Sequence, residues 1–306
     1  MEEKKPKVSV LIPAYNAEKF IQRTINSVLA QSFKDFEIVV LDDGSNDRTG
    51  EIVKAMQSRD KRVIYYYQDN RGLVNSRNRL VELSRGEFIA FLDHDDEWLP
   101  DKLKKQLTLF NKAPQPGLVF CDAYIKNNER AIARSFKERR PCRGDVFYQY
   151  LLSDNFVPLL TVILPREVLL KFMPFNQDYQ VNEEFEMFLR IARSFRFDYL
   201  DQPLAIYHVH GANTIIAKNE RFIDESFAVL DYWIMKEPEI KIRYKRELSN
   251  RLSQLYSKKG LYYLSRHDFN RVRPAILKSF RHRLMNIAAV KLSLKLILGR
   301  LKYGNK

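Results

Sequence analysis

Short apolar runs alternate with helical segments over the first 92 residues, and this alternation restricts the fold more than any other feature of the chain. The runs span Val8–Ile12, Glu37–Leu41, Val63–Tyr67 and Phe88–Leu92, and their β-branched and aromatic residues are typical of buried strands. The helical segments between them allow right-handed crossovers that keep successive strands parallel. We therefore predict an α/β fold with a Rossmann-like, mostly parallel sheet flanked by helices.

Three of the predicted strands end in residues that suit a ligand site. Pro13 follows the first strand, Asp43 follows the second, and Asp93 follows the fourth. Ligands bind outside the carboxyl ends of the strands in open α/β sheets, so we expect these residues on one rim and predict a nucleotide site there. Asp43 has a competing interpretation as a helix cap, and Ser45 or Asn46 is predicted to cap the helix after the second strand.

An acidic cluster, Asp93, Asp95 and Asp96, follows the fourth strand. Clustered carboxylates repel one another and resist desolvation, and at such a sheet edge they commonly hold a hard divalent cation through oxygen ligands. A solvated acidic turn is the alternative, because the D-x-D spacing alone is a weak signal. The glycine-rich fingerprints of dinucleotide-binding domains and P-loops are missing from the sequence, so neither class is supported.

The composition indicates an ordered protein with an anionic partner. The chain has 306 residues, 45% of them hydrophobic, and a net charge of +14. A nucleotide or a membrane surface is the expected partner; no nucleic acid is expected, because no nucleic-acid module is recognisable. The two cysteines allow at most one disulfide, which favours a reducing, cytoplasmic compartment. Neither a signal peptide nor an apolar run of membrane-spanning length is recognisable, so we expect a soluble or peripheral protein.

From Ile215 onward the sequence shows helical patterns only. We therefore predict two parts, a domain over residues 1–214 and a helical extension over residues 215–306. After Asp268 the chain has ten Lys and Arg residues and no acid, with apolar residues at helical spacing. Such a basic amphipathic tail suits the anionic inner face of a cell membrane, although a solvated charged face is the alternative.

A family resemblance is carried by the segments VSVLIPAYNAEKFIQRTINSVLAQSFKDFEIVVLDDGSNDRT, NRGLVNSRN and GEFIAFLDHDDEW. They resemble the inverting family 2 glycosyltransferases with the GT-A fold, a nucleotide-diphospho-sugar transferase fold. The resemblance runs from about Val8 to Leu107 and continues in later segments to Thr214. It implies transfer of a sugar from a nucleotide donor to an acceptor hydroxyl. The Gln-x-x-Arg-Trp block and membrane helices of processive members are missing, so single-sugar transfer is expected.

The resemblance gives roles to residues around the predicted nucleotide. Tyr15 suits stacking on a pyrimidine, and the backbone of Pro13 and Ala14 suits hydrogen bonding to its edge. By resemblance, Asp43 accepts from the ring N–H of uracil and Arg77 approaches the phosphates. The predicted nucleotide-binding residues are Pro13, Ala14, Tyr15, Asp43, Arg77, Asp93 and His94.

The resemblance also implies a metal cofactor, Mn²⁺ or Mg²⁺. Asp95 matches the carboxylate that ligates this ion between the diphosphate oxygens, and Asp93 faces either the ribose or the metal. His210 matches a family histidine near the metal, whereas His208 stands where arginine is common. A metal at this position is a Lewis acid for the departing nucleoside diphosphate. The predicted metal ligands are therefore Asp95, Asp93 and His210.

The acceptor-activating carboxylate falls, by resemblance, in the segment NEEFEMFLRIA. Glu184 matches it where Asp is usual, and the neighbouring Glu183 is a competing candidate for the general base. The predicted enzyme moves one sugar from a UDP-linked donor to a glycan or lipid-linked saccharide in cell-surface polysaccharide synthesis. Two other classes are a sugar nucleotidyltransferase, which usually has a glycine-rich loop where PAYN stands here, and a non-catalytic nucleotide-binding relative.

Overall fold

The computed structural model describes residues 5–127, 130–138, 140–153, 155–210 and 219–283, with Lys291 and Ser293. The chain divides into two compact units: residues 1–150 and 155–211 form the first, and residues 151–154 and 212–306 form the second. The boundary predicted at Thr214 lies among residues 211–218, outside the described residues, so the predicted boundary stays a prediction. Residues 284–306, which hold most of the predicted basic tail, are also outside them apart from Lys291 and Ser293.

The first unit is built on a nine-stranded sheet in the order β3-β2-β1-β4-β8-β6-β9-β5, with β7 paired to β6. The first four strands are parallel, as predicted, and β6 is parallel to β9. The remaining pairings are antiparallel, so the second half of the sheet is mixed. The strands are β1 (Val8–Ala14), β2 (Phe36–Asp43), β3 (Val63–Gln68), β4 (Phe88–Phe91), β5 (Glu97–Trp98), β6 (Leu118–Asn127), β7 (Arg130–Arg134), β8 (Ile163–Pro165) and β9 (Phe197–Val209).

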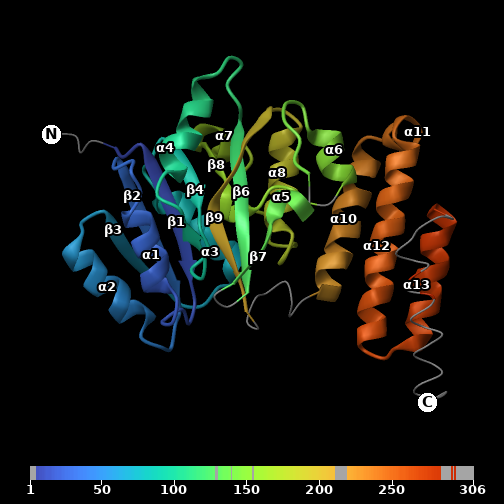
Figure 1. Ribbon diagram of the computed structural model, residues 1–306, viewed down its shortest axis with the longest axis horizontal. Coiled ribbons are helices and arrows are strands. Elements are labelled where there is room, and N and C mark those ends of the chain that lie inside the picture. The colour runs from blue at the N-terminus through green and yellow to red at the C-terminus, as the bar shows by residue number, and fades with distance from the viewer. Residues whose placement is uncertain are drawn as a thin grey trace. The chain divides into compact units, whose positions relative to one another are not determined.

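Helices cover both faces of this sheet, with α1 and α2 on one face and α3 on the other (Figure 1). Right-handed crossovers require this placement, because the chain moves outward from β1 to β3 and then returns to place β4 on the other side of β1. The ends of β1 and β4 therefore flank the point where the strand order reverses, which is where such sheets bind ligands. The helices and 3-10 turns that accompany the sheet are α1 (Ile21–Leu29), α2 (Thr49–Arg59), α3 (Leu73–Leu83), α4 (Lys102–Leu107), η1 (Thr108–Asn111), α5 (Ser135–Glu138), α6 (Phe147–Leu152), η2 (Leu159–Thr161), α7 (Arg166–Leu170) and α8 (Glu183–Ala192).

The core lies between the sheet and its helices. Every residue of β1 and β2 is buried, which matches their apolar, β-branched sequences. Helix α1 turns Ile21, Ile25 and Val28 into the core, and all three side chains are fully buried. Burying a side chain of this size stabilises the fold by about 1.5–3 kcal/mol, so α1 is firmly fixed to the sheet. Its polar face remains available to hold the loops at the strand ends.

Two local predictions differ from the structure. Strand β1 continues through Pro13 to Ala14, where residue 13 pairs in register with Leu41. The predicted caps of α2, Ser45 and Asn46, are wrong, because the helix begins only at Thr49. Ser45 accepts instead from the backbone N–H of Asn16, and Asp47 accepts from the backbone N–H of Thr49. The loop after β2 therefore uses its polar side chains to join β1 to α2.

The second unit, in its described part, consists of helices, as predicted from the sequence. They are α10 (Asn219–Lys236), α11 (Ile240–Arg243), α12 (Lys245–Ser265) and α13 (Phe269–His282). The hydroxyls of Ser253 and Ser257 each lie 2.9 Å from the hydroxyl of Ser279, so small polar side chains join α12 to α13. None of the helices that the structure describes combines the length and the apolar character needed to cross a membrane.

Candidate active site

The carboxyl ends of β1, β2 and β4 meet at one edge of the sheet. Ala14 pairs in register with Asp42 on β2. The ring nitrogen Nδ1 of His94, in the loop after β4, lies 3.1 Å from the carbonyl oxygen of Pro13. Asp43 and the acidic loop therefore lie on the same rim, with Tyr15 immediately after β1. The Tyr15 side chain is 44% exposed, which leaves its ring face accessible to a planar ligand.

Asp43 organises the loop before α3. Its carboxylate accepts from the Gln68 side chain at 2.7 Å and from the backbone N–H groups of Arg71 and Gly72 at 2.9 Å. Gly72 has a φ of +85°, a conformation that favours glycine. A carboxylate offers about four acceptor positions, so one position remains for the N–H of a bound base. Asp43 thus fixes a loop near the rim rather than capping α2.

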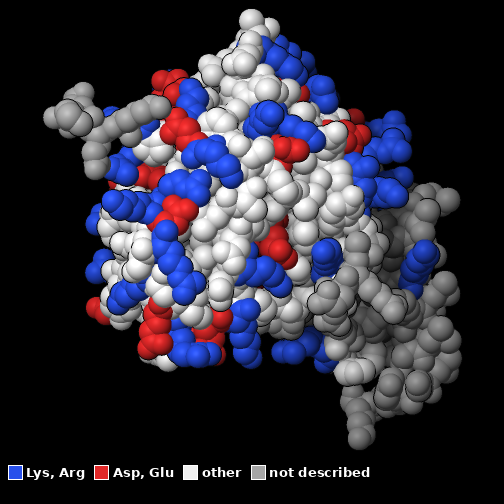
Figure 2. Space-filling view, turned by 60° about the vertical axis from the view of Figure 1, so that its left-hand side comes forward, with Lys and Arg blue, Asp and Glu red and all other residues white. Residues whose placement is uncertain are grey.

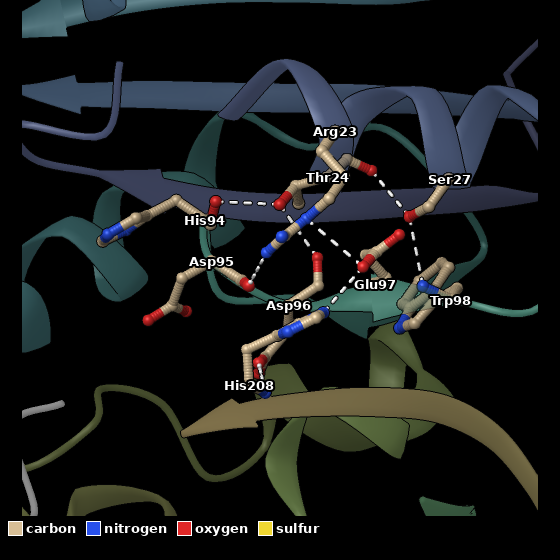
Figure 3. A network of polar contacts seen from close by, with 9 residues as sticks. All are labelled: Arg23, Thr24, Ser27, His94, Asp95, Asp96, Glu97, Trp98 and His208. Atoms are coloured by element: carbon tan, nitrogen blue, oxygen red, sulfur yellow. Dashed lines mark hydrogen bonds and ion pairs between the residues drawn. The ribbon is translucent and has the colours of Figure 1, made fainter. Parts of the chain in front are cut away.

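Helix α1 fixes the backbone of the acidic loop (Figure 3). The Arg23 guanidinium donates to the carbonyl oxygen of Asp95 at 2.8 Å. The hydroxyl of Thr24 lies 2.8 Å from the carbonyl oxygens of both His94 and Asp96. With its carbonyl held on the α1 side, the Asp95 carboxylate points away from Arg23 (Figure 3). The loop conformation that presents Asp95 is therefore set by side chains from a different element.

The Asp95 carboxylate meets His210, which follows β9. Oδ2 of Asp95 and Nε2 of His210 are 2.9 Å apart. Two ligands at right angles around a Mg²⁺-sized ion are about 3 Å apart, so this pair fits one divalent ion. Within the described part of the chain, no group of three His, Cys, Asp or Glu side chains is arranged to hold a metal. Two protein ligands fit an ion that takes its other ligands from substrate phosphates and water.

Asp93 lies apart from this pair and binds Arg77. The Arg77 guanidinium donates to Asp93 Oδ1 at 3.0 Å and also to Glu183, the first residue of α8. Arg77 is only 4% exposed, so it links the acidic loop, α3 and α8 from inside the protein. The structure thus brings Asp93 to the base candidates rather than into the Asp95–His210 pair.

The two glutamates at the start of α8 differ in environment. Glu183 is 1% exposed and bonded to Arg77, whereas Glu184 is half-buried. Burial, reinforced by the neighbouring charge of Glu183, raises the pKa of the Glu184 carboxyl well above the ordinary range. A carboxyl with a raised pKa is a stronger base once ionised, which suits proton abstraction near neutral pH.

A second set of contacts, which the sequence did not predict, supports the acidic loop. Asp96 is 1% exposed and accepts from the backbone N–H of His208 at 3.0 Å, and burial strongly raises its pKa. Glu97 binds Nε2 of His208 at 2.6 Å and Arg23 at 3.2 Å. The continuous acids Asp95, Asp96 and Glu97 were the sequence signal for these residues, but their partners on α1 and β9 are distant in sequence.

The comparisons with known proteins agree with this geometry. The model of the family described as glycosyl transferase family 2 matches residues 9–164. A UDP-Glc:alpha-D-GlcNAc-diphosphoundecaprenol beta-1,3-glucosyltransferase, WfgD of Escherichia coli, is 31% identical over 187 residues, which are 61% of this chain and 70% of that protein.

Two solved structures share the fold. S. aureus TarS 1-349 in complex with UDP-GlcNAc has a TM-score of 0.57 at 17% identity, covering 92% of this chain and 93% of that one. The mannosyltransferase PcManGT from Pyrobaculum calidifontis, in complex with GDP-Man and Mn²⁺, has a TM-score of 0.58 at 16% identity, covering 99% and 77%. The sheet and its flanking helices thus define a GT-A fold, which is followed by a helical extension. The family match spans half of the sequence, and the chain belongs to glycosyl transferase family 2.

Proposed function

We propose that this glycosyltransferase moves a single sugar, with inversion, from a UDP-linked donor to a hydroxyl of a glycan or lipid-linked saccharide, and that it depends on a divalent metal. The observation that carries the proposal is the pairing of Asp95 with His210 on the rim that also holds Asp43 and Tyr15. The names of WfgD and of the TarS complex, which include UDP-linked sugars, support a UDP donor.

The nucleotide would lie along the ends of β1 and β2. Tyr15 offers an exposed ring for stacking, and Asp43 has an acceptor position left for a base N–H. The carbonyl of Pro13 is already in contact with His94, so the backbone contribution from this strand would come mainly from Ala14. Arg77 is buried between two carboxylates, which supports a linking role for it in place of the predicted phosphate contact.

Asp95 and His210 would hold the metal beside the donor diphosphate. When bound, the ion would neutralise charge on the departing nucleoside diphosphate as a Lewis acid. The imidazole nitrogen favours Mn²⁺ over Mg²⁺, because Mg²⁺ selects oxygen ligands. The Mn²⁺ in the PcManGT complex supports a divalent ion for this fold.

Glu184 would act as the general base. Its half-buried carboxylate would take the proton of the acceptor hydroxyl as that oxygen attacks the anomeric carbon from the face opposite the leaving group. One displacement of this kind inverts the configuration. Glu183 is buried and tied to Arg77, so its part would be to anchor the first turn of α8.

The helical unit supports a location at the inner face of the cell membrane, with a role in surface polysaccharide synthesis. The exposed side chains of α13 include Arg273, Lys278 and Arg281 around Leu277, which is 59% exposed. The sequence of α13 contains no acid. Cations grouped around an exposed apolar side chain suit an anionic lipid surface, and the WfgD acceptor is named as a diphosphoundecaprenol-linked sugar.

Product analysis with the purified protein tests the proposal. We expect UDP to be released from a UDP-sugar in the presence of Mn²⁺ and not in the presence of EDTA. Release should be faster when a saccharide diphosphate lipid acceptor is added. GDP-mannose serves as the donor control, and Glu184→Gln serves as the control for contaminating hydrolases. Release of pyrophosphate from UTP and a sugar phosphate would instead indicate a nucleotidyltransferase. Nucleotide binding without turnover of any donor would indicate a non-catalytic relative.

A further inference from the structure

The aromatic ring of Phe20 lies flat against the imidazole of His210. The ring centroids are 5.0 Å apart and the planes differ by 14°. Phe20 is the residue immediately before α1, and His210 is the residue immediately after β9. Parts of the chain that are far apart in sequence therefore meet here. The same imidazole meets the Asp95 carboxylate through Nε2. Phe20 therefore touches one member of the pair to which we assign the metal.

Phe20 occupies a position that helix capping does not explain. It is the N-cap of α1 and makes no side-chain capping bond, although Ser, Thr, Asp or Asn is preferred there. Its side chain is only half-buried, in contrast to Ile21 and Ile25 of the core. A phenylalanine at this position thus contributes little to stability as a helix cap. It also contributes less by burial than a core residue does.

Phe20 also contacts the other support of Asp95. The guanidinium carbon of Arg23 lies 5.8 Å from the Phe20 ring centroid, within the range of a cation–π contact. Arg23 holds the backbone carbonyl of Asp95, and Phe20 faces the imidazole that meets its carboxylate. The first turn of α1 thus contacts both the backbone and the side-chain partner of one residue.

We propose that Phe20 is a positioning residue, whose ring fixes the plane of the His210 imidazole so that Nε2 is aimed at the Asp95 carboxylate. The inference rests on the proposed metal-dependent function. A parallel ring at contact distance restricts the tilt of the imidazole about its side-chain torsions. Outer groups that orient a metal ligand typically change metal affinity by about 10–100-fold when they are lost.

The test measures the affinity of the full chain for Mn²⁺ in the presence of UDP. Binding is monitored as the loss of the electron paramagnetic resonance signal of the free ion. We expect Phe20→Leu, which keeps apolar volume but removes the ring, to weaken Mn²⁺ binding about 10–100-fold. Phe20→Tyr, which keeps the ring, should bind Mn²⁺ as the wild type does. Tyr256→Leu is the matched control, because it removes a ring–imidazole stack with His282 inside the helical unit (5.7 Å, 6°).

His210→Ala and Asp95→Ala separate this inference from the proposed function. If both leave Mn²⁺ affinity unchanged, the metal site itself is wrong and the inference about Phe20 is overturned with it. If both weaken binding and Phe20→Leu does not, only the role of Phe20 is overturned. The role of Phe20 is also overturned if Phe20→Leu weakens Mn²⁺ binding but loses UDP affinity to the same extent in EDTA, since that would indicate general damage to the rim. The ring-current shift of the His210 imidazole protons should disappear in Phe20→Leu and persist in Phe20→Tyr.

Discussion

At the scale of single residues, burial separates side chains that look alike in the sequence. Glu183 and Glu184 are adjacent glutamates, but they differ in burial. Glu183 is buried and forms an ion pair with Arg77, whereas Glu184 is half-buried. Asp93 and Asp95 belong to one D-x-D spacing, yet Arg77 binds the first and His210 meets the second. Chemical type alone therefore does not assign the roles of these acids, and their neighbours do.

Replacing each glutamate by glutamine distinguishes the two base candidates. We expect Glu184→Gln to retain UDP binding and to lower kcat for transfer by about 10²–10⁴-fold, the usual contribution of a general base. Glu183→Gln should instead lower thermal stability, because it removes one partner of a buried ion pair. Calorimetric UDP affinity, kcat and Tm measured on both variants check this. If Glu183→Gln alone abolished turnover while its Tm stayed normal, the base would be Glu183.

The pH dependence of transfer follows from the raised pKa of Glu184, at about 8. The carboxyl must be ionised to accept a proton, so kcat/KM should rise with pH, about tenfold per unit below that pKa, and level off above it. The measurement is kcat/KM between pH 6 and pH 9.5 at saturating Mn²⁺. A profile that is flat across this range would contradict the assignment of Glu184 as the base.

At the scale of elements, side chains from α1 and α3 and the backbone of β9 hold the loops at the strand ends. Thr24 and Arg23 fix the acidic loop from α1, while the backbone of His208 on β9 meets Asp96. Arg77 on α3 joins this loop to α8. The acidic loop, where we place the donor, and the start of α8, where we place the general base, are therefore connected through the buried guanidinium of Arg77.

Removing that guanidinium should destabilise the first unit. Arg77→Met leaves two carboxylates, one of them fully buried, without their cation, which costs about 3–5 kcal/mol of the free energy of unfolding. Arg79→Met, on the same helix, breaks an exposed pair with Glu82 and should cost less than about 1 kcal/mol. Urea unfolding of both variants gives the comparison. Equal stability of the two variants would show that Arg77 does not serve as the link.

The sequence predicts elements better than it predicts contacts between them. The first four strands and the acids that follow them are readable, because apolar periodicity and strand-end polarity are local signals. The role of Ser45 could not be predicted from the sequence, because its hydroxyl accepts from the backbone N–H of Asn16 on another loop and does not cap the nearby helix. The stack of Phe20 on His210 joins residues 190 positions apart in the chain, and local pattern contains no trace of it.

At the scale of the whole molecule, charge is distributed unevenly along the chain. Residues 215–306 contain 21 Lys and Arg and 8 Asp and Glu, so they account for +13 of the net charge of +14. Figure 2 shows cations and acids interspersed over the face that it displays. The excess positive charge thus lies in residues 215–306 and not in the first 214 residues.

Neutralising the exposed face of α13 tests the proposed membrane contact. The triple change Arg273→Gln, Lys278→Gln and Arg281→Gln should weaken binding to anionic vesicles by about 3 kcal/mol, roughly 100-fold, at about 1 kcal/mol per cation. The control is Lys61→Gln, Lys104→Gln and Lys105→Gln, which makes the same change in charge at exposed positions of the first unit. Cosedimentation measures both. Equal vesicle binding by the two triple variants would reject α13 as the contact surface.

The central claim is that Asp95 holds a divalent ion beside a nucleoside diphosphate. Titration calorimetry of UDP against the wild type, Asp95→Asn and the nearby control Asp101→Asn, each with Mn²⁺ and with EDTA, tests it most directly. We predict that Mn²⁺ strengthens UDP binding at least tenfold in the wild type and in Asp101→Asn, and that Asp95→Asn binds UDP equally weakly in both buffers. A Mn²⁺-dependent gain that survives in Asp95→Asn would contradict the account.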